Sequence, residues 1–121
     1  MILRTGVDLI ETSRIAEAIE RHGERFLKRV FTEYELKECH GRVTSLAARF
    51  AAKEAVAKAL GTGIGDVSWL EIEIRSDEKK GPYVVLSGEG QGLAKRLGLK
   101  TWSLSLSHTE KQSIAFVVAT G

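Results

Sequence analysis

The sequence predicts an α+β domain in which a mostly antiparallel sheet packs against one long alanine-rich helix and shorter helices. Residues 45–60 contain seven alanines, and alanine has the highest intrinsic helix propensity. After residue 66 the apolar residues recur mainly with period two, which is typical of half-buried strands. Strands that follow one another as hairpins favour an antiparallel over a parallel sheet. With 121 residues and no linker or repeat, the chain is expected to form one domain over residues 1–121.

The composition excludes several classes of protein. An apolar share of 43% with 28% charged residues argues against disorder. No apolar run approaches the ~20 residues of a membrane span, and no signal-peptide pattern opens the chain, so we expect no membrane association and a cytoplasmic location. Eighteen basic against 16 acidic residues do not indicate nucleic-acid binding. The single Cys39 fits a reducing compartment, and with His40 beside it a thiol nucleophile is a remote alternative.

The first strand is predicted over residues 2–10, and it contains one acid. Strands disfavour aspartate, so Asp8 either lies at an exposed end of the strand or serves a purpose. The next helix is expected to follow at once, with Thr12 or Ser13 as its N-cap.

Two helical stretches follow the first strand. The core-facing stripe of the first recurs at helical spacing and consists of Ile15, Ala18, Ile19, Phe26 and Val30. Residues 22–23, His-Gly, weaken its middle and are the expected place of any break. Thr32 with Glu35 three residues later forms a capping box, which predicts the start of a second, short helix that ends near residues 39–41.

The strongest predicted helix spans residues 45–60, with Thr44 or Ser45 as its N-cap and Gly61 as its left-handed C-cap. The elements expected after it are a hairpin of strands at 70–74 and 82–86, a short helix at 89–97, and a hairpin of strands at 102–107 and 114–119. The last strand is apolar on both faces. We therefore expect a helix to cover one side of it, and either a sheet or another subunit to cover the other.

Asp8 and Glu54 are carboxylates in apolar settings and could hold a metal ion. Mg²⁺ prefers one or two carboxylates together with waters and substrate phosphates. The alternative is that Glu54 pairs with Lys58 one helical turn later, a contact worth ~0.2–0.5 kcal/mol. Spacing along the chain does not show whether Asp8 and Glu54 meet, so both interpretations stay open at this point.

Three glycines, Gly61, Gly63 and Gly65, follow the alanine-rich helix and free the backbone to approach a ligand. Glycine-rich loops often bind phosphate, but dinucleotide and P-loop motifs precede a helix, whereas this run follows one. Those two motifs are therefore excluded. A phosphate-contacting wall and a plain helix C-cap with a flexible turn both remain.

Residues 105–109, Ser-Leu-Ser-His-Thr, lie at the end of a predicted strand. A hydroxyl cluster with one histidine suits a phosphate or ribose contact, and a solvated turn with an exposed histidine is the alternative. A serine hydrolase needs a serine, a separate histidine and an orienting acid. Ser107 and His108 would point in opposite directions along a strand, which argues against that chemistry.

The first helical stretch carries a basic stripe, defined here as Arg14, Arg21, Arg25 and Arg29. Spacings of seven and four residues place the first three on one helical face, and Lys28 adds to it. Arginine pairs well with carboxylate and phosphate, so the stripe could meet an acidic partner. The alternative is a solvated face, because acidic residues are interspersed at 17, 20 and 24.

Together these motifs resemble one family, the holo-acyl-carrier-protein synthases, which are small bacterial phosphopantetheinyl transferases. The resemblance covers nearly the whole chain and rests on residues 6–11 with 14–15, 31–32 with 35–36, 49–55, 58–63 and 105–109. Its most specific part is the run Arg-Phe-Ala-Ala-Lys-Glu-Ala at 49–55, which leads into a Gly-Thr-Gly turn. Arg4 is a departure, since the family often has glycine there. It bears on the edge of the pocket and not on the reaction class.

The resemblance implies a phosphopantetheinyl transferase-like fold and a group transfer. Coenzyme A would donate its 4′-phosphopantetheine arm to a serine of apo acyl-carrier protein and release adenosine 3′,5′-bisphosphate, in support of fatty acid biosynthesis. The family pattern assigns the Mg²⁺ ligands to Asp8, Glu54 and the pyrophosphate of the coenzyme. Lys58 completes the implied catalytic set, and either Glu54 or a water held by the metal accepts the serine proton.

The resemblance also implies binding residues and an assembly. Arg49, Lys58 and His108 would contact the coenzyme, with residues 61–65 forming part of its wall. The basic stripe would dock the acidic carrier protein. Family members are commonly homotrimers whose sites lie at subunit interfaces, which fits a last strand that is apolar on both faces.

Two other functions stay open. A non-enzymatic binder could hold an acidic partner through the basic stripe, and its binding would depend steeply on salt without needing a divalent ion. A relative of the family could also modify some other carrier domain, for example in polyketide assembly, although the short chain favours the fatty-acid type.

Overall fold

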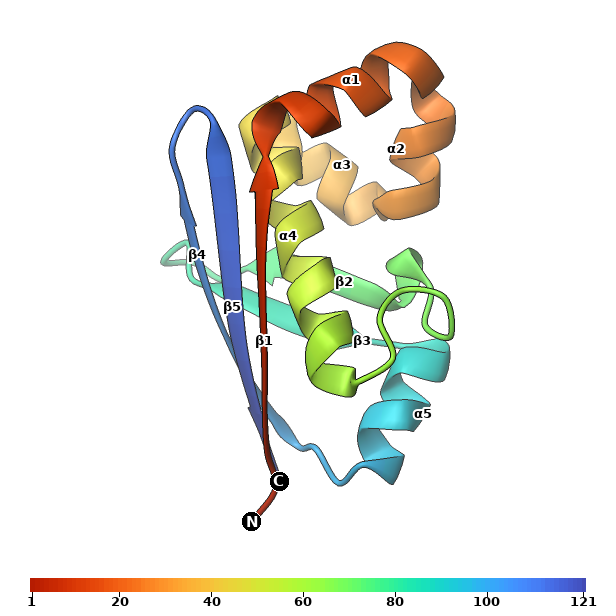
Figure 1. The fold of residues 1–121 in the computed structure, drawn as a ribbon, viewed down its shortest axis with the longest axis vertical. Helices are drawn as coiled ribbons and strands as arrows, with labels where there is room; N and C mark the ends of the chain where they lie inside the picture. The colour runs from red at the N-terminus through yellow and green to blue at the C-terminus, as the bar shows by residue number, and fades with distance from the viewer.

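Helix α4 lies at the centre of the fold, between a three-stranded sheet and a two-stranded hairpin (Figure 1). The computed structural model describes residues 1–121. The strands are β1 (Leu3–Glu11), β2 (Ile72–Ser76), β3 (Pro82–Leu86), β4 (Thr101–His108) and β5 (Gln112–Thr120). The helices are α1 (Thr12–His22), α2 (Glu24–Val30), α3 (Glu33–Cys39), α4 (Val43–Leu60) and α5 (Gly88–Arg96), with a 3₁₀ turn, η1, at Trp69–Glu71. This architecture confirms the predicted α+β class.

Both sheets are antiparallel, as predicted. The larger has the strand order β1-β5-β4, and pairing of Leu3 with Thr120 brings the two ends of the chain together. The β2–β3 hairpin forms a sheet of its own on the other side of α4 (Figure 1). Helices α1, α2 and α3 gather around the end of α4 at which that helix begins (Figure 1).

Strand β1 and helix α4 approach each other closely because both present small residues. Eleven of the 18 residues of α4 are buried, and seven of those are alanines. A Cβ atom at Gly6 would lie only 1.8 Å from the carbonyl oxygen of Ala55, so no larger residue fits there. Asp8 lies two residues further along β1 and therefore on the same, α4-facing side. Neither α4 nor any other helix is long and apolar enough to cross a membrane.

The predicted cap of the first helix is wrong. α1 begins directly after Glu11, and neither Thr12 nor Ser13 caps it with a side chain. The strand runs straight into the helix because the N–H of Thr12 still donates to the carbonyl oxygen of Lys111, at 2.8 Å. The expected break occurs at Gly23, which has a φ of 55° and separates α1 from α2.

Two further element starts differ from the predictions. α4 begins at Val43 and has no side-chain cap, so the predicted cap at residues 44–45 is wrong. Leu70 is not in a strand. Ser68 and Glu71 form a capping box at the start of the 3₁₀ turn that contains Leu70, and the strand begins at Ile72. The alternation of Leu70, Ile72 and Ile74 predicts a strand that includes Leu70. The side-chain hydrogen bonds of the capping box instead stabilise a turn at that residue.

One face of the larger sheet is open. On the side turned away from α4 no helix or sheet covers it (Figure 1). Five large apolar side chains there are 40–61% exposed, namely Leu3, Val7, Leu9, Ile114 and Phe116. The expectation that the last strand is covered on both sides is therefore met only on the α4 side within one chain.

Candidate functional site

Asp8, Glu54 and Lys58 come together where β1 packs against α4. Glu54 and Lys58 are one turn apart on that helix, and Asp8 is on the strand face turned toward it. The Nζ of Lys58 donates to the carbonyl oxygen of Val7 at 2.9 Å and lies 3.3 Å from Oδ1 of Asp8. Lys58 therefore pairs with Asp8, and the helical Glu54–Lys58 ion pair considered from the sequence is not formed.

A cavity of about 390 Å³ opens beside the two carboxylates, and we call it the carboxylate cavity. Its charged lining consists of Asp8, Glu54 and Arg14. The rest of its lining is apolar and comes from β1, α1, α2 and α4: Leu9, Ile10, Ile15, Ala18, Phe26 and Phe50. The site thus joins two acids, one cation and an apolar wall in a space that can take part of a ligand.

The two acids are close enough to influence each other. Burial raises the pKa of the Glu54 carboxyl, the negative charge of Asp8 raises it further, and the ammonium of Lys58 partly offsets both effects. A cation between the carboxylates would relieve this repulsion. The site therefore has the electrostatic character of a cation site.

The donor set suits Mg²⁺ and not a metal that needs a full protein cage. No group of three or more His, Cys, Asp or Glu side chains in the chain could hold a metal ion. Mg²⁺ is commonly held by one or two carboxylates, with waters and phosphate oxygens completing its shell. Asp8 and Glu54 supply that number of ligands.

We expect Glu54→Gln to stabilise the metal-free protein at neutral pH. The folded state raises the pKa of Glu54, so the stabilisation that this group contributes is present at low pH and is lost as the pH rises through that pKa. The glutamine amide does not ionise, so the variant avoids this loss of stability at neutral pH. The advantage of the variant should vanish below about pH 4, where the carboxyl is protonated in both states. Thermal melts in EDTA across this pH range check it, and a lower Tm for the variant at neutral pH would contradict it.

The glycine loop begins where α4 ends. Gly61 takes the left-handed C-cap that the sequence predicts, with a φ of 85°. Arg4 packs against this helix end, and its Nε donates to the carbonyl oxygen of Ala59 at 2.8 Å. A cation at a helix C-terminus is favourable, which accounts for an arginine at this position. Nothing lies within 4 Å of a Cβ built at Gly63 or Gly65, so this side of the loop has room for a ligand.

Arg49 lies away from the two carboxylates. Five residues separate it from Glu54, which is about 140° around a helix. Its guanidinium lies 3.4 Å from the carbonyl oxygen of Ile74 and 3.4 Å from the Sγ of Cys39. Burial raises the pKa of the Cys39 thiol, although Arg49 counteracts this, so a thiolate nucleophile beside His40 is disfavoured.

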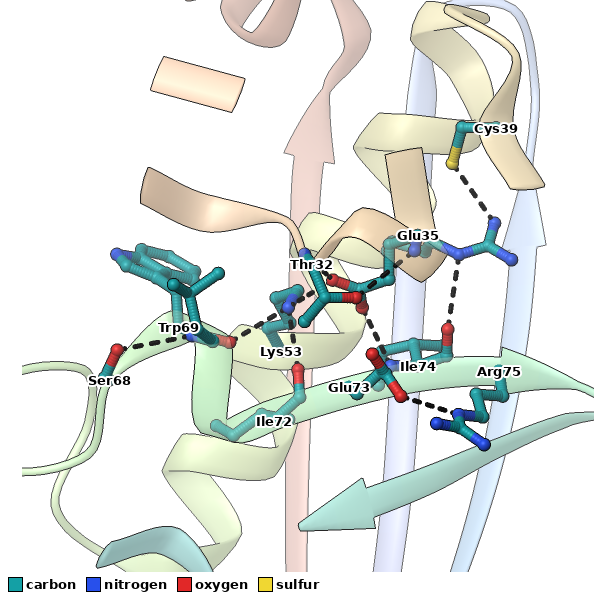
Figure 2. Close-up of polar contacts among 12 residues, drawn as sticks. Thr32, Glu35, Cys39, Lys53, Ser68, Trp69, Ile72, Glu73, Ile74 and Arg75 are labelled. Carbon is teal, nitrogen blue, oxygen red and sulfur yellow. Dashed lines mark hydrogen bonds and ion pairs between the residues drawn. The ribbon is translucent and has the colours of Figure 1, made fainter. Parts of the chain in front are cut away.

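A buried ion pair on this side of α4 was not predicted. The Nζ of Lys53 lies 2.6 Å from Oε1 of Glu35, and both side chains are fully buried (Figure 2). The capping box of Thr32 and Glu35 is present as predicted, and the same carboxylate serves both contacts. The sequence signal that could have indicated this pair is a lysine inside an alanine-rich helix, because a buried charge nearly always needs a partner.

His108 also lies apart from the carboxylates. It ends β4, and Ser113 of β5 lies between it and Ile10 of β1. His108 is therefore two strand spacings, or about 10 Å, from Ile10 on β1. The imidazole is exposed, and the neighbouring Thr109 lines a second cavity of about 770 Å³ that includes neither acid of the carboxylate cavity. Within one chain, therefore, neither Arg49 nor His108 joins the carboxylates.

The basic stripe is divided between two helices. Arg14 and Arg21 lie on α1, whereas Arg25 and Arg29 lie on α2. The prediction that Arg14, Arg21 and Arg25 lie on one helical face is wrong, because the chain turns at Gly23. All four arginines are exposed, and of the four only Arg14 lines the carboxylate cavity.

Known proteins resemble this chain over nearly its full length. Residues 4–117 match the 4′-phosphopantetheinyl transferase superfamily. Holo-[acyl-carrier-protein] synthase from Herpetosiphon aurantiacus is 50% identical, covering 99% of this chain and 100% of that protein. The protein of the same name from Halothermothrix orenii is 46% identical, covering 98% of this chain and 97% of its own length.

Solved structures share the fold. Holo-[acyl-carrier-protein] synthase from Neisseria meningitidis superposes with a TM-score of 0.90 at 38% identity, covering 98% of each chain. The enzyme of the same name from Helicobacter pylori, solved in complex with coenzyme A, superposes with a TM-score of 0.88 at 34% identity. That alignment covers 96% of this chain and 99% of the other.

Proposed function

The chain belongs to the 4′-phosphopantetheinyl transferase superfamily, and from this we propose that it transfers the 4′-phosphopantetheine of coenzyme A to a serine of apo acyl-carrier protein. Holo-acyl-carrier protein and adenosine 3′,5′-bisphosphate are the products. The observation that carries the proposal is that Asp8 and Glu54 line one cavity and that Lys58 pairs with Asp8. Relatives up to half identical in sequence are named for this reaction, and one similar structure was solved with coenzyme A.

The proposed chemistry divides the work among three side chains. Asp8 and Glu54 hold Mg²⁺, which when bound would neutralise charge developing on the pyrophosphate as the bisphosphate leaves. The exposed ammonium of Lys58 binds a phosphate oxygen of the coenzyme. The serine oxygen of the carrier protein attacks the phosphorus that bears the pantetheine arm, the bond to the leaving bisphosphate breaks, and Glu54 accepts the serine proton.

A mass-shift assay tests the reaction. Purified protein with Mg²⁺ and coenzyme A should raise the mass of apo acyl-carrier protein by one phosphopantetheine, and EDTA should prevent this. The non-enzymatic alternative instead predicts salt-sensitive binding of the carrier protein, no change in mass and no effect of EDTA. Unmodified carrier protein at saturating Mg²⁺ and coenzyme A would contradict the proposed function.

We propose the carrier protein of fatty acid synthesis as the natural partner and the cytoplasm as the location. The full-length match to a relative named holo-[acyl-carrier-protein] synthase supports the first, and the free, buried Cys39 fits a reducing compartment. The mass-shift assay run with several apo carrier domains ranks the partners. Faster modification of a polyketide carrier than of a fatty-acid carrier would overturn the choice of partner without affecting the reaction class.

We expect Arg14→Glu to raise the KM for carrier protein at least about tenfold, and the KM for coenzyme A much less. Arg14 is exposed on α1 and lines the carboxylate cavity, so a reversed charge would repel an acidic partner just where its serine enters. Like charges facing each other in an interface cost several kcal/mol, of which about 1.4 kcal/mol suffices for tenfold. Arg96→Glu on α5, exposed and outside this cavity, is the matched control. Equal effects of the two variants would contradict the docking role.

We also propose a homotrimer whose sites lie at subunit interfaces. The five exposed apolar side chains on the open face of the larger sheet support an interface between copies. Arg49 and His108, distant from the carboxylates within one chain, could then reach the coenzyme from a neighbouring subunit. We expect analytical ultracentrifugation to give three times the chain mass, and Phe116→Glu to give the monomer with most activity lost. A fully active monomer would contradict the shared site.

A further inference from the structure

Lys53 is held inside the molecule by a complete set of acceptors. Its Nζ donates to Oε1 of Glu35 at 2.6 Å, to the carbonyl oxygen of Ile72 at 2.7 Å and to that of Trp69 at 2.9 Å (Figure 2). An ammonium has three protons, and each has a partner here. The side chain therefore has one orientation, and α4 is tied through it to α3, η1 and β2.

The carboxylate of Glu35 is equally well occupied. Its Oε1 accepts the N–H of Thr32 at 2.8 Å as well as the lysine, and its Oε2 accepts the N–H of Ile74 at 2.8 Å. Neither side chain of the pair has any exposed surface. None of these groups lines the carboxylate cavity, so the reaction proposed above does not use them directly.

α4 packs closely, as at Gly6, but most of its buried residues are alanines, whose apolar contacts are not directional. Outside the pair, directional contacts of α4 include those of Arg49 with Ile74 and of Lys58 with Val7 on β1. Apart from Lys53, the buried side chains of α4 are apolar and make no directional contacts. A buried polar pair is weak evidence for stability, and its best-attested role is to specify register.

Glu54 follows Lys53 directly along α4. Consecutive residues of a helix point about 100° apart, so any rotation or slide of α4 that moves the lysine also moves the glutamate. Lys53 points toward β2 and α3, whereas Glu54 points toward Asp8 on β1. The place of Glu54 relative to Asp8 is thus set by the contacts on both sides of the helix.

We propose that the Glu35–Lys53 pair is the positioning device of the carboxylate cavity. It fixes the rotation and axial register of α4, and so holds Glu54 where it and Asp8 can bind the same divalent ion. This inference rests on the proposed Mg²⁺ site. The pair touches neither substrate nor ion, so both members are positioning residues and not catalytic ones.

Calorimetric titration of Mg²⁺ into the protein saturated with coenzyme A tests the inference. Lys53→Met and Glu35→Gln should each raise the Mg²⁺ dissociation constant about tenfold or more, the loss expected when the support of a metal ligand is disturbed. The Mg²⁺ dissociation constant of the double variant should be no higher than that of the single variant that binds Mg²⁺ less tightly, because the two changes remove one interaction. Lys53→Arg keeps the charge but not the ammonium geometry, and it provides a folded variant if Lys53→Met does not fold.

Leu99→Ala is the matched control for loss of stability. Leu99 is a buried core residue outside both the pair and the carboxylate cavity, so this change should lower the Tm and keep the Mg²⁺ dissociation constant within about twofold. Unchanged Mg²⁺ affinity in the folded pair variants, an equal loss in Leu99→Ala, or multiplying effects in the double variant would each overturn the inference. Failure of the proposed Mg²⁺ site would look different, because Asp8→Asn would then bind Mg²⁺ as tightly as the unaltered protein.

Discussion

Asp8→Asn and Glu54→Gln are each expected to lower kcat for phosphopantetheine transfer by at least about 10²-fold without unfolding the protein. Each change removes one of the two negative charges of the carboxylate cavity and keeps the shape of the side chain. Glu54→Gln also removes the group proposed to accept the serine proton. The rate should fall in kcat as well as in kcat/KM, because the lost interactions act mainly in the transition state.

The matched control is Glu78→Gln, which removes an exposed carboxylate in the turn between β2 and β3. It should leave the rate unchanged. The readout is the initial rate of carrier-protein modification at saturating Mg²⁺ and coenzyme A, with circular dichroism to verify folding. Full activity in either acid variant, with the protein folded, would refute the assignment of that acid.

Gly6→Ala is expected to destabilise the fold at or above the upper end of the ~1–3 kcal/mol typical of overpacked cores. The added Cβ would lie 1.8 Å from the carbonyl oxygen of Ala55, and this neighbour is backbone, which cannot rotate away. α4 would have to move off β1, and with it Glu54 and Lys58 would move off Asp8. Chemical denaturation should therefore show a lower free energy of unfolding, and transfer activity should fall in the protein that remains folded.

Gly92→Ala provides the matched comparison. Gly92 lies within α5, and the nearest atom to an added Cβ there is the tip of the flexible Arg96 side chain at 3.5 Å. Alanine is the better helix former by ~0.5–1 kcal/mol, so this variant should be as stable as the original or more stable. A Gly6→Ala protein as stable as Gly92→Ala would show that β1 and α4 do not pack as described.

Local signals in the sequence account for most of the fold. The Thr32–Glu35 capping box, the left-handed Gly61 and the weak point at residues 22–23 all act within a few residues, and each appears in the structure where it was predicted. The period-two segments became the strands of two hairpins. Starts of elements were less predictable, because backbone contacts such as that from Lys111 replaced the side-chain caps.

The site could be predicted only in part, since its contacts join distant segments. Lys58 could pair equally well with Glu54 one turn away or with a remote acid, and only the close packing of β1 decides for Asp8. The Glu35–Lys53 pair joins two helices, and the lysine in the alanine-rich helix indicates a buried charge without identifying its partner. In the same way, the spacing of the basic stripe assumed a helix that continues, whereas the chain turns at Gly23.

The proposed function depends on Asp8 and Glu54 binding one and the same divalent ion. Crystals grown with coenzyme A and Mn²⁺ test it most directly, because manganese scatters anomalously and replaces Mg²⁺ in oxygen-ligand sites. An anomalous peak should lie in contact with carboxylate oxygens of both residues and with the pyrophosphate. A peak bound by other residues, or one that touches only one of the two carboxylates, would contradict it.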